Sequence, residues 1–182
     1  MADSLIWIPK RLVELGLINL AAQQPAAFAA YCEQDYRSRI SAAAQAVLQS
    51  GAHVVMLTGP SASGKTTTAH KLSEEIHRCG RESAVISLDN FFKNIENYPR
   101  LADGTPDYES VDALDITEIN RALLEIVQTG KTEIPDFDFC REVRRQGTMS
   151  VSVGDGIVII EGIHALNPRL TICDLLTEGL VE

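Results

Sequence analysis

Gly59-Pro60-Ser61-Ala62-Ser63-Gly64-Lys65-Thr66 is the stretch of sequence that decides the fold. It has the G-x-x-x-x-G-K-[ST] pattern of a phosphate-binding loop, and it stands in the context that this pattern requires. The apolar run 54–57 before it predicts a buried strand, and residues 65–78 after it predict a helix with apolar side chains on one face. We therefore expect a strand, a glycine-bounded loop and a helix that together bind nucleotide phosphates. The alternative is an ordinary Gly/Ser turn between a strand and a helix.

Each part of this loop has its own physical role. Glycine at positions 59 and 64 permits backbone conformations that a Cβ would penalise, so the loop N–H groups can surround an anion. Lys65 is suited to the β- and γ-phosphates, and the Thr66 hydroxyl is suited to Mg²⁺. The expected nucleotide-binding residues are Gly59, Pro60, Ser61, Ala62, Ser63, Gly64, Lys65, Thr66 and Thr67.

The composition is that of an ordinary globular protein. The chain has 182 residues, 45% of them hydrophobic, and a formal net charge of −9. Such an acidic chain is a poor general surface for nucleic acid, and no run approaches the roughly 18 apolar residues that would span a membrane. The four cysteines are scattered without a C-x-x-C pair, which is typical of free thiols in a reducing cytosol. We expect a cytoplasmic protein with neither nucleic acid nor membrane as partner.

Residues 1–50 are expected to form a helical extension before a nucleotide-binding domain at 51–182. Leu12, Leu15, Ile18 and Leu20 recur at helical spacing, and an alanine-rich stretch predicts a second helix over about 25–49. This extension could be a regulatory or dimerising arm, which leaves room for a homo-oligomer. We favour the other interpretation, a helical layer packed on the sheet, because an apolar helical stripe usually faces a core.

The rest of the chain alternates between predicted strands and helices. Segments 54–57 and 157–160 are apolar without alternation, which indicates strands buried on both faces of a parallel sheet, and 83–88 is the strand expected between them along the chain. Asp115 is a good N-cap for a helix that ends before Gly130. Residues 93–114 have the composition of a long loop. Segments 132–139 and 148–153 predict two short strands of an edge hairpin, with the basic cluster Arg141, Arg144 and Arg145 between them. Near the end of the chain lies one apolar stretch, residues 170–176.

Two carboxylates follow predicted strands. Asp89 and Glu161 should lie beside Gly59, because ligands of open parallel sheets bind outside the carboxyl ends of the strands. Phosphoryl transfer needs a phosphate cradle, a metal ion and a group that orients or deprotonates the attacking oxygen. Thr66, Asp89 and Glu161 could supply the metal shell, and Asp89 is the better candidate for the base. The alternatives are a turn cap for Asp89 and an ion pair with a basic residue for Glu161.

Five motifs in order resemble the uridine kinase-like nucleoside kinases, within the phosphoribulokinase/uridine kinase group of P-loop kinases. The motifs are residues 59–66, 87–92, 106–115, 134–139 and 158–167, and the resemblance covers about residues 30–175. It implies an α/β fold, the three-layer α/β/α P-loop kinase fold with a mostly parallel sheet, preceded here by the helical segment. Members of this family continue with a further strand, an arginine-rich lid and a last strand, so we expect the domain to be incomplete after Glu182.

The resemblance also implies the chemistry of the site. It implies ATP or GTP as donor, Mg²⁺, and a nucleoside 5′-hydroxyl as acceptor, with Asp89 as catalytic base and Lys65 on the phosphates. The substrate residues that it implies are Tyr108, Glu109, Phe137, Phe139 and Arg144.

The chain departs from the family pattern in the acceptor pocket. The family usually has tyrosine at Phe92 and often at Phe137, aspartate at Glu109, and, in uridine–cytidine kinases, a base-reading histidine at Glu142. Two alternatives therefore stay open: a kinase of the same group for another small hydroxyl acceptor, such as a sugar phosphate or a pantothenate-like molecule, and a nucleotide-binding module without catalysis.

Overall fold

The computed structural model describes residues 16, 18, 19 and 22–170. The expected stripe of Leu12, Leu15 and Leu20 and most of the apolar stretch 170–176 lie outside these residues. The helices are α2 (Pro25–Ser50), α3 (Lys65–Arg78) and α4 (Ile116–Thr129), and the strands are β1 (Val54–Leu57), β2 (Ser83–Ser87), β3 (Lys131–Asp138), β4 (Val143–Ser152) and β5 (Ile157–Glu161). Single 3₁₀ turns span Leu88–Phe91, Ile95–Asn97 and Val111–Ala113.

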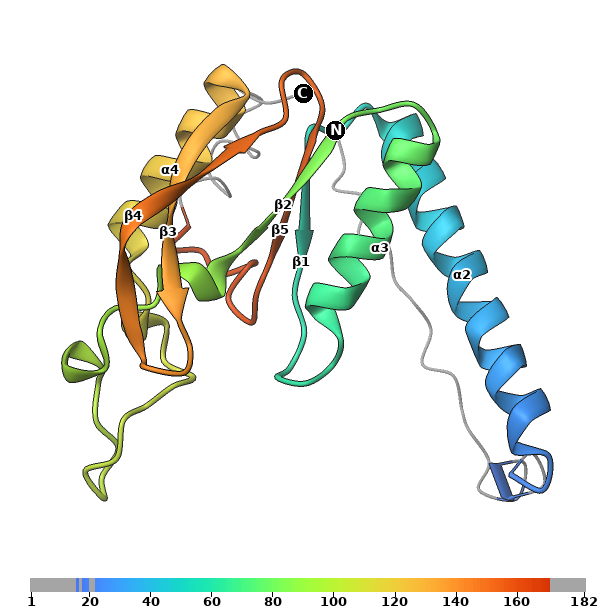
Figure 1. Cartoon of the computed structure of the whole chain (residues 1–182), viewed down its shortest axis with the longest axis horizontal. Coiled ribbons are helices and arrows are strands. Elements are labelled where there is room, and N and C mark those ends of the chain that lie inside the picture. The colour runs from blue at the N-terminus through green and yellow to red at the C-terminus, as the bar shows by residue number, and fades with distance from the viewer. Residues whose placement is uncertain (1–15, 17, 20–21, 171–182) are drawn as a thin grey trace. The chain divides into compact units, whose positions relative to one another are not determined.

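Three parallel strands form the central sheet in the order β1-β5-β2 (Figure 1). The register pairs Val55 of β1 with Ile159, and Ile159 in turn with Val85 of β2. The parallel arrangement confirms the expectation from the unbroken apolar runs. β2 ends at Ser87, one residue earlier than expected, because Leu88 already begins a 3₁₀ turn.

The two faces of β5 contribute to two different hydrophobic clusters. Val158 and Ile160 pack in a cluster with Leu123 of α4. Ile157 and Ile159 pack in a second cluster with Leu72 of α3. Successive side chains of a strand point to opposite faces, so helices cover the sheet on both sides. This is the expected three-layer α/β/α fold, and all five residues of β5 are buried.

The helix α3 begins where the phosphate loop ends. Gly64 is its N-cap at φ 84°, a conformation that a Cβ would strain, and no side chain caps the first turn. We expected Gly59 to adopt a backbone conformation that a Cβ would penalise, and this reason is wrong. Gly59 does not have a positive φ; instead, a Cβ there would lie 3.0 Å from Ser63 Oγ. The residue of the loop that does adopt a positive φ besides Gly64 is Ala62, at 57°.

The C-terminal part of α2 fits the interpretation as a layer that covers the sheet. Ala44 is buried in the cluster with α3, and Val47 and Leu48 pack against it. By its internal contacts the chain divides into two compact units, residues 1–39 and 40–182, with the boundary inside α2. The expected domain boundary between residues 50 and 51 stays a prediction.

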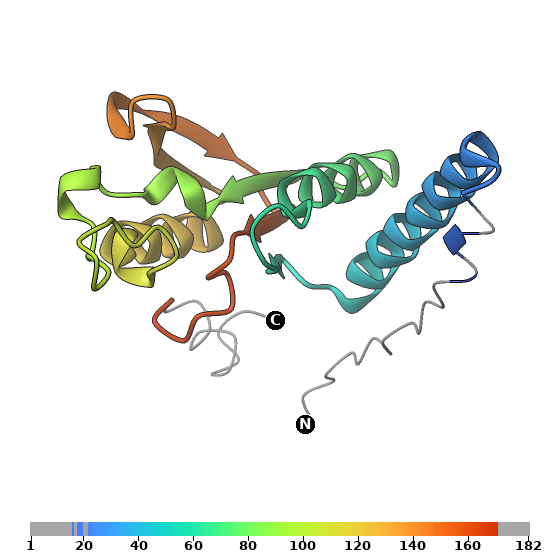
Figure 2. The same cartoon turned by 90° about the horizontal axis from the view of Figure 1, so that it is seen from below.

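The strands β3 and β4 form an antiparallel hairpin, as expected. Figure 2 shows the hairpin and α4 on the same side of β2, away from α3. β4 begins at Val143, five residues earlier than expected, so Arg144 and Arg145 are strand residues and only Arg141 lies in the turn. Almost all of β4 is exposed, and its residues 143–147 are mostly polar, so they lack the alternation by which strands are recognised.

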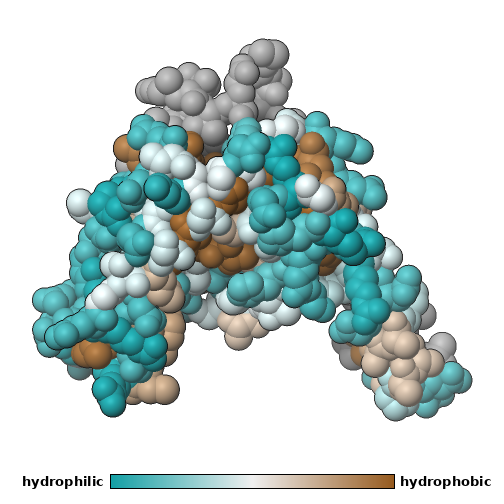
Figure 3. All heavy atoms as spheres, turned by 45° about the horizontal axis from the view of Figure 1, so that its top comes forward, coloured by the Kyte–Doolittle hydropathy of each residue, from teal (hydrophilic) through white to brown (hydrophobic). Residues whose placement is uncertain are grey.

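The visible surface in Figure 3 is mostly hydrophilic, with hydrophobic atoms gathered in smaller patches. None of the helices within the described ranges is both long and apolar enough to cross a membrane. Cys32, Cys79 and Cys140 are exposed free thiols, as expected.

Candidate active site

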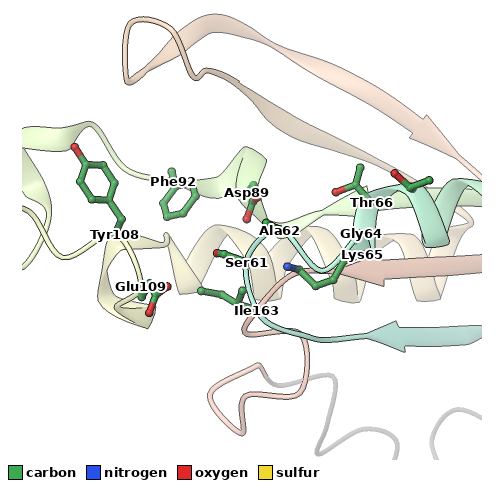
Figure 4. A pocket seen from close by; sticks show the side chains of 11 residues that line it. Ser61, Ala62, Gly64, Lys65, Thr66, Asp89, Phe92, Tyr108, Glu109 and Ile163 are labelled. Carbon is green, nitrogen blue, oxygen red and sulfur yellow. The ribbon is translucent and has the colours of Figure 1, made fainter. Parts of the chain in front are cut away.

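A cavity of about 560 Å³ lies at the carboxyl ends of β1, β2 and β5. Figure 4 shows the phosphate loop on one side of it and Tyr108 and Glu109 on the other, with Asp89 between them. The lining residues are Ser61, Ala62, Gly64, Lys65, Thr66, Thr67, Asp89, Phe92, Tyr108, Glu109 and Ile163. The structure therefore brings most of the expected site residues to one cavity.

The phosphate loop presents donors to this cavity. The uncapped first turn of α3 leaves backbone N–H groups without intrahelical partners, which is the arrangement that binds phosphate at helix N-termini. Lys65 Nζ donates a hydrogen bond of 2.9 Å to the Pro60 carbonyl oxygen, so the ammonium group lies over the loop itself.

Glu161 lies at the end of β5, directly behind the loop. Its side chain is 1% exposed, and its Oε1 accepts a hydrogen bond of 3.0 Å from the Thr66 hydroxyl. Within the described residues, the Glu161 carboxylate thus has a hydroxyl as its hydrogen-bond partner. The alternative, an ion pair between Glu161 and a basic residue, is not supported. A buried carboxylate is costly unless it is paired or coordinates a metal.

Asp89 follows β2, in the first 3₁₀ turn. Burial raises the pKa of the Asp89 carboxyl above its ordinary value, and the negative charge of Glu161 raises it further, while Lys65 and His164 oppose the shift. The alternative role as a turn cap is wrong, because Ser87 is the cap and its Oγ accepts from the Asp89 backbone N–H at 3.4 Å. The Asp89 side chain is left to face the cavity.

These three residues fit a magnesium site. The part of the chain that the structure describes holds no group of three or more His, Cys, Asp or Glu side chains that could hold a metal by themselves. Mg²⁺ does not need such a cage, because it keeps several waters and binds one or two carboxylates together with substrate phosphates. Thr66, Asp89 and Glu161 would hold it in that way.

Tyr108 and Glu109 form the far end of the cavity. The Tyr108 ring is about half exposed, and its hydroxyl donates to Glu142 Oε1 at 3.1 Å. Phe92 lines the same end and stacks on Tyr98, with ring centroids 5.7 Å apart. Burial, and then the Glu142 charge, raise the pKa of Tyr98 to about 12, so this tyrosine is neutral.

Phe137, Phe139 and Arg144 are not among the residues that line this cavity. The Phe137 side chain is 5% exposed, lies beneath Phe92 with ring centroids 5.7 Å apart, and contacts the exposed ring of Phe139. Arg144 donates to the carbonyl oxygens of Phe91 and Phe92, at 3.1 and 2.9 Å. It also pairs with Asp115 at 3.3 Å. In this structure Phe137 and Arg144 contact Phe92, and Phe139 contacts Phe137.

Of the lining residues, Ile163 was not assigned to the site from the sequence, and Phe92 was considered only as a departure from the family pattern. Phe92 lies three residues after Asp89, and Ile163 lies two residues after Glu161. That spacing is a usable signal, because both residues come shortly after a strand of the parallel sheet, where ligands bind.

The fold and this combination of side chains define the class of P-loop kinases. A sequence model of the phosphoribulokinase / uridine kinase family matches residues 54–176. The chain belongs to this family.

Its relatives include curated uridine kinases. It is 29% identical over 113 residues to the uridine kinase of Lactobacillus helveticus (strain DPC 4571), covering 62% of this chain and 53% of that one. It is 34% identical over 112 residues to the uridine kinase of Schizosaccharomyces pombe, covering 60% of this chain and 24% of that one. The chain therefore spans about half the length of the bacterial relative and less of the yeast one.

A solved structure supports the fold. The structure of a possible uridine kinase from Bacillus stearothermophilus superposes with a TM-score of 0.62 at 21% identity, covering 75% of this chain and 76% of that one.

Proposed function

We propose that this protein transfers the γ-phosphoryl group of ATP to the 5′-hydroxyl of a nucleoside, in the presence of Mg²⁺. One observation carries the proposal: a single cavity joins the phosphate loop to Asp89 and then to Phe92, Tyr108 and Glu109. The residues proposed for the donor site, the base and the acceptor site thus line one cavity. The curated relatives named uridine kinase support a nucleoside as acceptor.

On the donor side, the N–H groups of the loop would bind the phosphates, and Lys65 would leave Pro60 to neutralise the β- and γ-phosphates. Thr66, Glu161 and Asp89 would hold Mg²⁺, which neutralises the charge that develops on the phosphate oxygens. The hydrogen bond between Thr66 and Glu161 fixes the orientation of the hydroxyl.

On the acceptor side, Asp89 would accept the proton of the attacking hydroxyl. The new O–P bond forms as the bond between the γ-phosphorus and the bridging oxygen breaks, and ADP leaves. The raised pKa of Asp89 makes its carboxylate a better proton acceptor than an ordinary aspartate.

The nucleoside would lie between the aromatic side chains and the carboxylate at the far end of the cavity. Phe92 and Tyr108 offer ring faces for a base, and Glu109 offers oxygens for ribose hydroxyls. In this proposal Phe137 and Arg144 hold Phe92 in position without contacting the nucleoside. Phe139, which contacts Phe137, extends the aromatic surface. A substrate such as ATP also fits a cytoplasmic location.

The test is transfer of radiolabelled phosphate from ATP, and separately from GTP, to a panel of nucleosides by the full chain. We expect transfer to at least one nucleoside, dependent on Mg²⁺ and lost in Lys65→Ala and Asp89→Asn. A sugar phosphate and pantothenate belong in the same panel, because transfer to them alone would replace the nucleoside by another small hydroxyl acceptor. Tight ATP binding without transfer to any acceptor would favour a non-catalytic nucleotide-binding module.

A further inference from the structure

The segment 162–170, which follows β5, contacts the phosphate loop. The Gly162 N–H donates to the Leu57 carbonyl oxygen at 3.2 Å, and the Thr58 hydroxyl donates to the Ile163 carbonyl oxygen at 3.0 Å. Leu57 and Thr58 directly precede Gly59. The segment is therefore attached to the chain that leads into the loop, and Ile163 lines the cavity itself.

The same segment contacts the loop that carries Tyr108 and Glu109. His164 Nε2 lies 2.9 Å from the Glu109 carbonyl oxygen, and Arg169 Nη1 lies 2.7 Å from Asp112 Oδ1. In the view of Figure 4, Ile163 lies between the phosphate loop and Glu109. Donor and acceptor ends of the cavity are thus joined by one short segment.

The two contacts with this loop hold different parts of the chain, a side chain in one case and the backbone in the other. The side chains of Arg169 and Asp112 are both half exposed, and exposed ion pairs contribute little to stability. His164 instead holds a main-chain carbonyl, so it fixes the path of the backbone at Glu109 and leaves the carboxylate of that residue available for a ligand. Of the two, the histidine is the contact that can set the position of Glu109.

The chemistry of the His164 contact fixes which atom carries the proton. A carbonyl oxygen only accepts, so Nε2 must donate. Both the neutral imidazole with its proton on Nε2 and the imidazolium ion can donate from this atom. Either form can therefore make this contact with the backbone.

We propose that His164 is a positioning residue of the acceptor site: its Nε2–H donates to the Glu109 carbonyl and so fixes the position of residues 107–112 relative to the phosphate loop. The proposal rests on the proposed function in that it takes residues 108–109 as the acceptor site. It predicts that His164 affects acceptor binding and the order of this loop and leaves ATP binding unaffected.

The test compares His164→Ala with His164→Gln, whose amide Nε2 can donate from nearly the same place. The matched control is His70→Ala on the exposed face of α3. Hydrogen exchange of the amides of residues 107–114 in the full chain is the first measurement, because several of these amides are hydrogen-bonded within the loop. We expect exchange about two- to tenfold faster in His164→Ala, as the loss of one hydrogen bond implies, and near wild-type exchange in His164→Gln and His70→Ala. Amides of β5 should not change, which shows that the fold persists.

The second measurement is kinetic. With an acceptor identified by the transfer assay, His164→Ala should raise the KM for that acceptor about two- to tenfold and leave the dissociation constant of ATP unchanged, and His164→Gln should restore the KM. Equal loop exchange in the Ala variant and the wild type would overturn the proposal, and so would a loss of ATP affinity in the Ala variant. The exchange and ATP measurements need no acceptor, so they stand even if no nucleoside is phosphorylated.

Discussion

The Thr66 hydroxyl donates a 3.0 Å hydrogen bond to the buried carboxylate of Glu161, and so joins the first turn of α3 to the last residue of β5. Glu161→Gln keeps an oxygen that can accept this bond and removes the negative charge beside the metal. We expect correct folding and an apparent Mg²⁺ affinity lower by about 10- to 100-fold, the effect typical of groups that orient metal ligands. The measurement is the Mg²⁺ dependence of the initial rate.

Thr66→Ser and Thr66→Ala are the matched pair for this experiment. Serine keeps the hydroxyl and should behave like the wild type. Alanine should lower the apparent Mg²⁺ affinity, as Glu161→Gln does. Equal activity of the Ala and Ser variants at limiting Mg²⁺ would contradict a role of Thr66 in the metal shell.

Lys65 is the mobile cation of the phosphate loop, bound to the Pro60 carbonyl oxygen at 2.9 Å. Lys65→Ala removes a charged donor worth about 2 kcal/mol to a phosphate, so we expect ATP to bind about 30-fold more weakly. Titration with a fluorescent ATP analogue measures this. Lys131→Ala, at the exposed start of β3, is the control and should bind ATP normally. Unchanged affinity in Lys65→Ala would exclude this loop as the nucleotide site.

Asp89 should control the rate and its pH dependence. Asp89→Asn cannot accept a proton, so kcat should fall by about 10²- to 10⁴-fold with ATP affinity nearly unchanged. In the wild type, burial and Glu161 raise the pKa of Asp89, so kcat/KM should decline with falling pH at a higher pH than an aspartate of ordinary pKa, about 3.9, would give. A pH–rate profile measures this limb. Survival of the rate in Asp89→Asn would show that another group is the base.

The same shift predicts a cost in stability. The folded-state pKa of Asp89 is raised, so the stabilisation that its protonated form provides is present below the unfolded-state pKa and lost as pH rises through the folded-state pKa. Above the folded-state pKa the ionised carboxylate therefore destabilises the fold, and the neutral Asp89→Asn should have a higher Tm than the wild type. Thermal unfolding between pH 7 and pH 4 tests this, since the difference should shrink as the pH falls. A lower Tm at pH 7 would contradict it.

The phosphate loop and the carboxylates could be predicted from the sequence because local patterns determine them. The strand before the loop, the helix after it, and the position of Asp89 and Glu161 at strand ends all follow from apolar runs that stop at polar residues. The N-cap role of Asp115 was equally local, and its Oδ1 accepts from the Glu118 N–H at 3.2 Å.

What could not be predicted depends on contacts between distant segments. Arg144 was expected at the substrate, but the carbonyl oxygens of Phe91 and Phe92 and the carboxylate of Asp115 hold it against the turn, and no local pattern encodes that. The hydroxyl partner of Glu161 and the contact of His164 with Glu109 are likewise long-range.

The central position of β5 has a consequence for how the protein is made. β1 and β2 each pair with β5 and not with one another, and β5 is the last of the three to leave the ribosome. The hydrogen bond of Thr66 cannot form until Glu161, 95 residues further along the chain, has been synthesised. A nascent chain that has exposed only β1, the phosphate loop and β2 therefore has neither a joined sheet nor the carboxylate that accepts from Thr66. The proposed metal site is thus completed only once β5 has emerged, late in translation.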